Sequence, residues 1–488
     1  MIYTLEGHAL KHAVEEMLLT LLPAVTLARA EQPPEQGDYC RSILIEQDGA
    51  AQVRAVVRLD GTTRESARSA SVAGLAPLDY KRTVTELVKS TVYDAVVPAL
   101  AEPPVWGSLT GVRPAKLARG LIARGMSRGE AAEHLREHFH VSPARTALTI
   151  RAAATAMALD QTIGKEDISL YVGIPFCPSR CYYCSFVSSA TAQSGHLIEP
   201  YLETLCHEIA QTAALVREAG KRIQSVYIGG GTPTTLNEKQ LARLLGTLEQ
   251  SFDFSGLCEY TVEAGRPDTI TPDKLRVLKA AGVNRVSINP QSMDDAVLAA
   301  IGRRHTAEDV LRAYDEAREV GFSAINMDLI AGLTGDTVQS FAQTVRQLTR
   351  LAPENITVHT LAIKRGADLT DKAAAAAQRT AVARMLEGAA DTLQRAGYGP
   401  YYLYRQKFMA GGFENVGWCR PGTECFYNVA MMEELQTILS LGAGGVSKRV
   451  DRDTGWIERV NNPKYPLEYI AASERLAAGK RKLLFPEQ

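Results

Sequence analysis

The stretch YVGIPFCPSRCYYC, residues 171–184, places three cysteines directly after a strand-like run. Cys177, Cys181 and Cys184 have the spacing Cys-x-x-x-Cys-x-x-Cys. Three thiolates on one short loop can bind three irons of a [4Fe–4S] cube, and the open fourth iron can then chelate a small molecule. Zinc held by three cysteines and a histidine is the alternative, although the next histidine, His196, lies twelve residues beyond Cys184.

From residue 171 onward, short strand-like runs alternate with helical segments. The runs are 171–176, 225–229, 260–263, 285–288, 324–329 and 356–360. This alternation predicts an α/β fold built from βα units on a parallel sheet. Six units are too few for a closed eight-stranded barrel, so we expect an open, partial (β/α)6 barrel over residues 166–365. The functional site is expected at the carboxyl ends of its strands.

Residues on either side of this barrel form two further predicted parts. Residues 1–165 predict an α+β domain, with a hairpin around Asp48-Gly49, a helix over 81–100 and helical patterning up to 159. Residues 366–488 predict a C-terminal cap over the barrel mouth, because a helical segment at 370–397 precedes an aromatic and glycine-rich stretch.

Composition excludes several classes of protein. The 54 lysines and arginines balance 55 aspartates and glutamates, which argues against a basic nucleic-acid-binding coat. With 45% hydrophobic and 22% charged residues, the chain has the composition of an ordinary globular protein. The N-terminus lacks the pattern of a secretion signal and no apolar run is long enough to span a bilayer, so we expect a cytoplasmic protein.

The other five cysteines carry simpler predictions. Cys40, Cys206 and Cys258 stand alone and are expected to be small buried residues. Cys419 and Cys425 form a looser pair, for which we favour a structural role over a redox or metal-binding one.

A glycine-rich stretch, YIGGGTPT at 227–234, follows the second predicted strand, where glycines let backbone groups approach a ligand closely. Together with the cysteine loop, it resembles the radical S-adenosylmethionine (SAM) superfamily and, within it, the oxygen-independent coproporphyrinogen III oxidase group. The resemblance continues through residues 261–263, 285–292, 301–305 and 326–333.

The resemblance implies two cofactors, a [4Fe–4S] cluster on Cys177, Cys181 and Cys184 and a SAM molecule on its open iron. Family positions at the strand ends imply SAM contacts from Gly230, Gly231, Thr232, Glu263, Gln291, Arg303 and Asp328. These residue types suit the task, because carboxylates bind hydroxyl or ammonium groups and a guanidinium binds a carboxylate. Tyr171 matches a family tyrosine near the cluster and the substrate, and is the candidate catalytic residue.

Two further stretches resemble the HemZ-type branch of this group. They are the N-terminal WGSLTGVRP at 106–114 and the aromatic and glycine-rich segments between 401 and 445. The implied activity is a coproporphyrinogen III dehydrogenase, which converts propionates to vinyl groups by hydrogen-atom abstraction and loss of carbon dioxide and one electron. A low-potential electron donor such as flavodoxin or ferredoxin is the implied partner.

Substrate contacts would combine cations for the propionates with aromatic surface for the ring. The candidates are Arg304, His305, Lys364, Arg365, Arg405 and Lys407, with Tyr401, Tyr402, Tyr404 and Trp418. One departure concerns Phe186, because the authentic oxidases carry a fourth cysteine there and the related haem chaperones do not. The alternatives are therefore a haem-binding carrier and a radical-SAM methyltransferase or other tetrapyrrole-modifying enzyme.

Overall fold

The computed structural model describes the chain except residues 24, 185–187, 362–371, 407–411 and 487–488. It divides into two compact units. The first comprises Met1–Ile150, Lys364–Ala376 and Arg405–Phe413, and the second comprises Arg151–Ile363, Ala377–Tyr404 and Glu414–Gln488. The sequence-based boundaries at 165 and 365 stay predictions.

The first unit is built on a sheet with the order β2-β1-β3-β4-β5 among its described residues. Its predicted hairpin forms around Asp48 and Gly49, which both have the positive φ that a tight hairpin turn requires. Its elements are β1 (Ile2–Glu6), α1 (Lys11–Leu21), β2 (Ala28–Arg29), β3 (Tyr39–Gln47), β4 (Ala50–Leu59), β5 (Thr62–Ser71), α2 (Pro77–Val96), α3 (Pro114–Ala123), α4 (Arg128–Glu137) and α5 (Pro143–Asp160), the last of which continues into the second unit.

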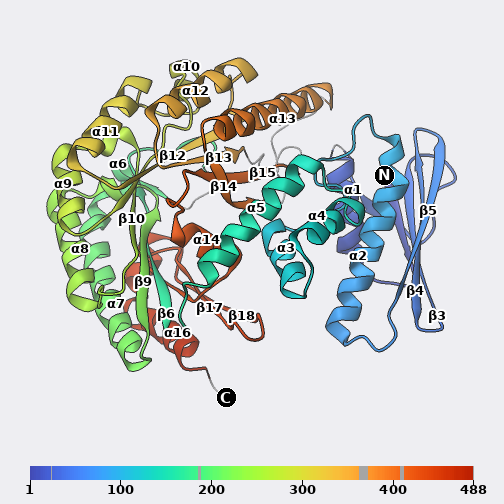
Figure 1. Ribbon diagram of the computed structural model, residues 1–488, viewed down its shortest axis with the longest axis horizontal. Helices are drawn as coiled ribbons and strands as arrows, with labels where there is room; N and C mark the ends of the chain where they lie inside the picture. Colours follow the sequence, from blue (N-terminus) through green and yellow to red (C-terminus); the bar gives the residue numbers. More distant parts are fainter. Residues whose placement is uncertain (24, 185–187, 362–371, 407–411, 487–488) are drawn as a thin grey trace. The chain divides into compact units, whose positions relative to one another are not determined.

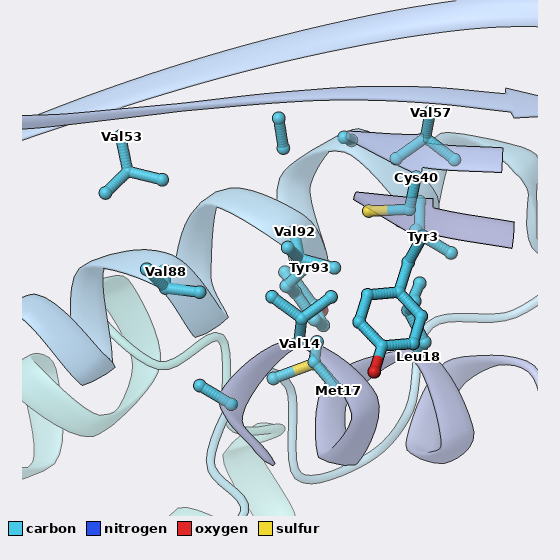
Figure 2. Packing of buried hydrophobic residues seen from close by; sticks show 14 of the residues in the cluster. Tyr3, Val14, Met17, Leu18, Cys40, Val53, Val57, Val88, Val92 and Tyr93 are labelled. Atoms are coloured by element: carbon cyan, nitrogen blue, oxygen red, sulfur yellow. The ribbon is translucent and has the colours of Figure 1, made fainter. Parts of the chain in front are cut away.

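One hydrophobic core joins this sheet to α1 and α2 (Figure 2). Alternate residues of β4 point into it, including Val53 and Val57, as expected for a strand with one buried face. Val88 and Val92 of α2, spaced four residues apart, lie on one helical stripe that packs against the strands. Cys40 is fully buried here, as predicted.

The second unit contains the predicted partial barrel (Figure 1). Within the described residues its strands pair in parallel in the order β13-β12-β11-β10-β9-β6, and the six strands match the six predicted runs. They are β6 (Asp167–Ile174), β9 (Arg222–Gly230), β10 (Glu259–Gly265), β11 (Arg285–Ile288), β12 (Ala324–Ala331) and β13 (Asn355–Thr360). Their near-continuous burial is typical of parallel strands covered on both faces.

Helices connect these strands, and several begin with well-formed caps. Reciprocal capping boxes at Asn237, Thr306 and Thr337 satisfy the first free backbone N–H groups of three of them. The helices after the cysteine loop are α6 (Thr191–Ser194), α7 (Ile198–Glu218), α8 (Glu238–Ser251), α9 (Pro272–Ala280), α10 (Asp295–Ala300), α11 (Ala307–Val320) and α12 (Val338–Leu351).

The C-terminal residues add to the barrel sheet at both edges, which the sequence did not predict. β15 (Glu414–Cys419) pairs antiparallel with β13, and β16 (Ile438–Leu441) pairs in parallel with β6. The remaining elements are α13 (Lys372–Arg395), β14 (Gly399–Arg405), α14 (Phe426–Glu433), β17 (Val446–Val450), β18 (Ile457–Asn461), α15 (Pro466–Ala471) and α16 (Leu476–Leu484).

Candidate functional site

The three cysteines follow the end of β6, on a loop that starts with the two-residue strand β7 (Phe176–Cys177). β7 pairs with the equally short β8 (Ser189–Ala190). The Thr232 hydroxyl donates to Cys177 Sγ at 3.5 Å, and Arg266 Nη1 donates to Cys181 Sγ at 3.6 Å. Each of these two contacts places a hydrogen-bond donor against a cysteine sulfur.

Arg266 is one of the site residues that the sequence did not predict. Its side chain is only 3% exposed, and it also donates to the carbonyl and hydroxyl oxygens of Ser179 within the cysteine loop. Asp268 binds the other side of the guanidinium at 3.1 Å. A cation directly after the predicted strand at 260–263 was the available signal, since strand ends carry the site in this fold class.

Arg303 contacts the cysteine loop at Tyr183, next to the third cysteine. Its guanidinium donates to the Tyr183 hydroxyl at 2.9 Å and to the Asn289 carbonyl at 3.4 Å. The backbone N–H of Tyr182 bonds the carbonyl of Ile301 at 3.3 Å. Arg303, predicted to bind SAM, therefore also ties the loop after β11 to the cysteines.

The glycines at the end of β9 lie against the backbone of β6. A Cβ on Gly231 would stand 2.6 Å from the carbonyl oxygen of Phe176 and 2.9 Å from that of Ile174. Gly230 has a φ of +110°, and its Cβ would lie 3.3 Å from the Tyr171 hydroxyl. A side chain is thus excluded at Gly231 by backbone contact and strained at Gly230 by its positive φ.

Glu263, at the end of β10, points its carboxylate at these glycines. Its Oε1 accepts from the Tyr227 hydroxyl at 2.6 Å, and its Oε2 accepts from the Gly230 N–H at 3.2 Å. Burial raises the pKa of Glu263 to about 7, and the nearby charge of Asp328 also raises it. The hydrogen bond from Tyr227 acts in the opposite direction and lowers this pKa. Near neutral pH this carboxyl can hold or release a proton.

Asp328, on β12, behaves in the opposite way. Burial alone would raise its pKa, but the His359 ring at 3.8 Å and the Asn326 amide at 2.8 Å hold the pKa of Asp328 below its usual value. The neighbouring Gln291 has a φ of +67°, and its N–H donates to the Asp328 carbonyl at 2.9 Å. Environments that push two carboxyls apart in pKa are typical of functional sites.

Tyr171 belongs to a group of three stacked tyrosines. The ring centroids of Tyr227 and Tyr427 are 4.6 Å apart, and each lies 6.3 Å from that of Tyr171. Burial and the charge of Glu263 raise the pKa of Tyr171, so it is a neutral hydroxyl donor at physiological pH. Tyr427 comes from α14, far away in sequence, and the sequence reasoning did not find it.

These residues fit a cluster with an organic ligand beside it. The sulfurs of Cys177 and Cys181 have hydrogen-bond donors, and the Gln291 Oε1 atom is buried without a partner, which leaves it available to a ligand. Across the described residues, no three His, Cys, Asp or Glu side chains converge as ligands of a single metal ion. A cube does not need such convergence, because each thiolate binds a different iron.

The sequence matches the protein-family model described as the Radical SAM superfamily over residues 171–348. The oxygen-independent coproporphyrinogen-III oxidase-like protein HemZ of Bacillus subtilis (strain 168) is 40% identical over 384 residues, which cover 78% of this chain and 77% of that protein. This chain belongs to the radical SAM superfamily. Radical SAM proteins use a [4Fe–4S] cluster and SAM, as predicted, and the likeness to HemZ confirms the predicted branch.

Two other relatives have names that describe different functions. The solved structure of coproporphyrinogen III oxidase (HemN) from Escherichia coli has a TM-score of 0.51 and 27% identity, and covers 67% of this chain and 73% of its own. The heme chaperone HemW of Bacillus subtilis is 37% identical over 197 residues, which are 40% of this chain and 51% of HemW. The likeness to the HemN structure confirms the fold of a partial barrel.

Several predicted substrate contacts are buried or bonded to other parts of the protein, and they stay predictions. His305 is only 3% exposed, and burial lowers its pKa to about 4, so it is no cation at neutral pH. Arg405 donates to the carbonyls of Leu109 and Gly412 and lies over the Trp106 ring. Three predicted ring-stacking residues are packed in the core: Tyr401, Tyr402 and Trp418.

The other substrate candidates remain predictions. Arg304 is exposed and Tyr404 is half-buried. Four residues that the sequence analysis singled out lie outside the described residues: Phe186, Lys364, Arg365 and Lys407.

The cysteines outside the loop differ in environment. Cys419 and Cys425 are buried, and the Cys425 thiol donates to Glu259 at 3.2 Å, which fits the structural role predicted for them. The prediction of burial is wrong for Cys258, which is exposed, and Cys206 is half-buried. As for membrane insertion, the helices in the described part of the chain are all too short or too polar to cross a bilayer.

Replacing Gly231 with alanine should damage the site directly. The new methyl group would meet two backbone carbonyl oxygens that cannot move independently. We expect a loss of about 1–3 kcal/mol in the free energy of unfolding, together with SAM binding weakened by about tenfold or more, measured by equilibrium dialysis on anaerobic protein. Gly246→Ala is the matched control, because its Cβ would meet nothing within 4 Å on α8; equal SAM affinity in both variants would contradict the prediction.

Glu263 should make stability depend on pH. An acid whose pKa is raised by folding binds more protons when folded, so its favourable contribution is complete below about pH 4.5 and is lost as the pH rises through about 7. Wild-type SAM-free protein should therefore lose more unfolding free energy between about pH 5 and 8 than Glu263→Gln, by at most a few kcal/mol. Thermal unfolding at both pH values measures this, and parallel pH profiles would contradict it.

Proposed function

We propose that this chain is an oxygen-independent coproporphyrinogen III dehydrogenase that decarboxylates propionates to vinyl groups in haem biosynthesis. The supporting observation is the relationship to the HemZ oxidase-like protein over most of both chains. The likeness to the HemN structure adds support, because HemN is a coproporphyrinogen III oxidase. The proposal rests on these relatives for the substrate and on the strand-end residues for the chemistry.

In this proposal Cys177, Cys181 and Cys184 hold the cluster. Its chemistry, once reduced, is the cleavage of SAM to a 5′-deoxyadenosyl radical. The proposed SAM contacts are Gly230, Gly231, Thr232, Glu263, Gln291, Arg303 and Asp328. Their support is the strand-end geometry, in which Gln291 offers an unpartnered amide oxygen and Asp328 an ionised carboxylate suited to an ammonium group.

Tyr171 would orient the substrate as a neutral hydroxyl donor. The Tyr227 and Tyr427 rings fix its position, and a Cβ on the adjacent Gly230 would lie 3.3 Å from its hydroxyl. The hydrogen atom leaves the β-carbon of a propionate, and loss of carbon dioxide and one electron to an acceptor leaves the vinyl group. A low-potential donor such as flavodoxin or ferredoxin is the proposed source of electrons for the cluster.

An anaerobic product assay tests this function. Reconstituted protein with coproporphyrinogen III, SAM, a reductant and an electron acceptor should release carbon dioxide and form protoporphyrinogen. SAM cleavage without any vinyl product would contradict the dehydrogenase proposal.

The likeness to HemW supports a haem carrier as the second candidate. This candidate predicts stoichiometric haem binding and transfer to an apoprotein, with no release of carbon dioxide. The two activities are separated by running both assays on the same cluster-loaded preparation.

A further inference from the structure

The first unit contains a cavity of about 440 Å³ between α2 and the loop that precedes α3. Its volume falls in the range of small-molecule binding sites. All the residues that line it belong to Met1–Ile150, so the cavity is formed by this unit alone. One wall is part of the stretch WGSLTGVRP, which the sequence analysis singled out and which the barrel chemistry does not use.

The cavity is preformed by contacts that fix its walls. Lys89 of α2 donates to the Thr110 hydroxyl at 2.7 Å and to Glu16 at 2.6 Å, which ties the loop to the helix. On the same loop, the Leu109 carbonyl accepts from Arg405. A ligand would therefore meet an ordered site and avoid much of the entropic cost of ordering it.

Basic residues outnumber acidic ones in the lining, although Lys89 is already paired with Glu16 at 2.6 Å. Lys81, Arg82, Lys89 and Arg113 line the cavity, whereas Glu86 is its one acidic lining residue. The Glu86 carboxylate already contacts His138 Nε2. Arg82 pairs with Asp79 only across exposed surface, at 3.7 Å, and such pairs contribute little. The cavity therefore favours an anion.

The cations are spread out rather than gathered at one point. Lys81 and Lys89 lie eight residues apart on α2, which is roughly 12 Å along a helix. Apolar side chains, Leu109, Leu117 and Phe139, line the space with them. Separated cations around apolar surface match a broad, apolar ligand with several separate carboxylates better than they match a single phosphate group.

We propose that this cavity is a tetrapyrrole-binding site, distinct from the barrel site in the residues that form it, that holds its ligand through propionate groups. The identification of the ligand as a tetrapyrrole rests on the proposed function. Two kinds of tetrapyrrole carry propionates and could bind here, namely coproporphyrinogen-type substrates and haem. Such a site would retain the substrate or product of the barrel on the same chain.

The test is a titration of cluster-loaded, full-length protein under anaerobic conditions. The probes are coproporphyrin III, which carries four propionates, and haem, which carries two. Binding of each probe is measured by absorbance and by calorimetry. The double variant Lys81→Glu/Arg82→Glu should weaken tetrapyrrole binding at one site by about tenfold or more. A tenfold loss of affinity corresponds to only about 1.4 kcal/mol of binding free energy. Both side chains are exposed, so the fold should tolerate the change.

Lys239→Glu/Arg350→Glu is the matched control, because it reverses two exposed helical cations of the second unit. It should leave the affinities unchanged, and SAM cleavage should be normal in both double variants. A preference for coproporphyrin III or for haem identifies the source of the ligand.

Identical tetrapyrrole affinity and stoichiometry in the wild type and Lys81→Glu/Arg82→Glu would overturn the proposal. So would charge-dependent binding of ATP with no tetrapyrrole binding at this site. The outcome is separate from the product assay, because that assay measures carbon dioxide release from the barrel and the titration measures a charge-dependent binding step.

Discussion

Cys181→Ala should abolish both the iron–sulfur absorption near about 400 nm and SAM cleavage, because the cluster loses one of three thiolate ligands. We expect the effect to be complete within detection. Cys181 is buried and lies against the Arg266 guanidinium, which cannot itself serve as an anionic ligand. Iron and sulfide analysis of anaerobically purified protein measures the loss, and 5′-deoxyadenosine formation measures the activity.

Cys258→Ser is the control for this experiment, since Cys258 is exposed and outside the cysteine loop. It should retain the cluster and SAM cleavage. A Cys181→Ala protein with full iron, sulfide and SAM cleavage would contradict the assignment of this cysteine, and zinc in place of iron in the wild type would contradict the cluster proposal.

Lys480→Met should cause the largest loss of stability. Lys480 and Glu208 are both 0% exposed, and Nζ donates to Glu208 Oε1 at 2.5 Å. Removing the cation leaves a buried carboxylate without its charge partner, which costs about 3–5 kcal/mol in similar cases. Chemical unfolding should show this loss.

The same network reaches the candidate site. Glu208 also accepts from the N–H of Gly442 at 2.7 Å, and a Cβ on Gly442 would stand 2.4 Å from the Gly173 carbonyl. Gly173 is two residues from Tyr171, so Lys480→Met should also lower SAM cleavage by loosening the end of β6. The effect on activity should follow the effect on stability.

Two variants control this prediction. Arg481→Met removes the next cation on α16, but the Arg481–Glu218 pair is exposed, so little change is expected. Glu208→Gln in the Lys480→Met background removes the uncompensated charge and should recover much of the stability. Equal stability of Lys480→Met and Arg481→Met would contradict the argument from burial.

Local patterns in the sequence determined the barrel and the approximate position of its site. Each of the six parallel strands is a short apolar run followed by a helical segment, and both periodicities are read over a few residues. The cysteine spacing and the glycine run are local for the same reason. The family resemblance implied the strand-end residues Glu263, Gln291 and Asp328, and parallel strands bring their carboxyl ends to one edge, so a shared edge could be expected without knowledge of their contacts.

Only the tertiary structure decided which long-range partners these residues meet. Arg266 reaches Cys181 across 85 positions, and Tyr427 stacks on Tyr227 across 200 positions of sequence. Burial, which sets the pKa of Glu263 near 7 and makes His305 neutral, depends on segments that local periodicity does not specify. Local sequence thus determined the strands and their order along the chain. Contacts between distant segments determined the pKa values of the site residues, because both desolvation and charge interactions depend on three-dimensional distance.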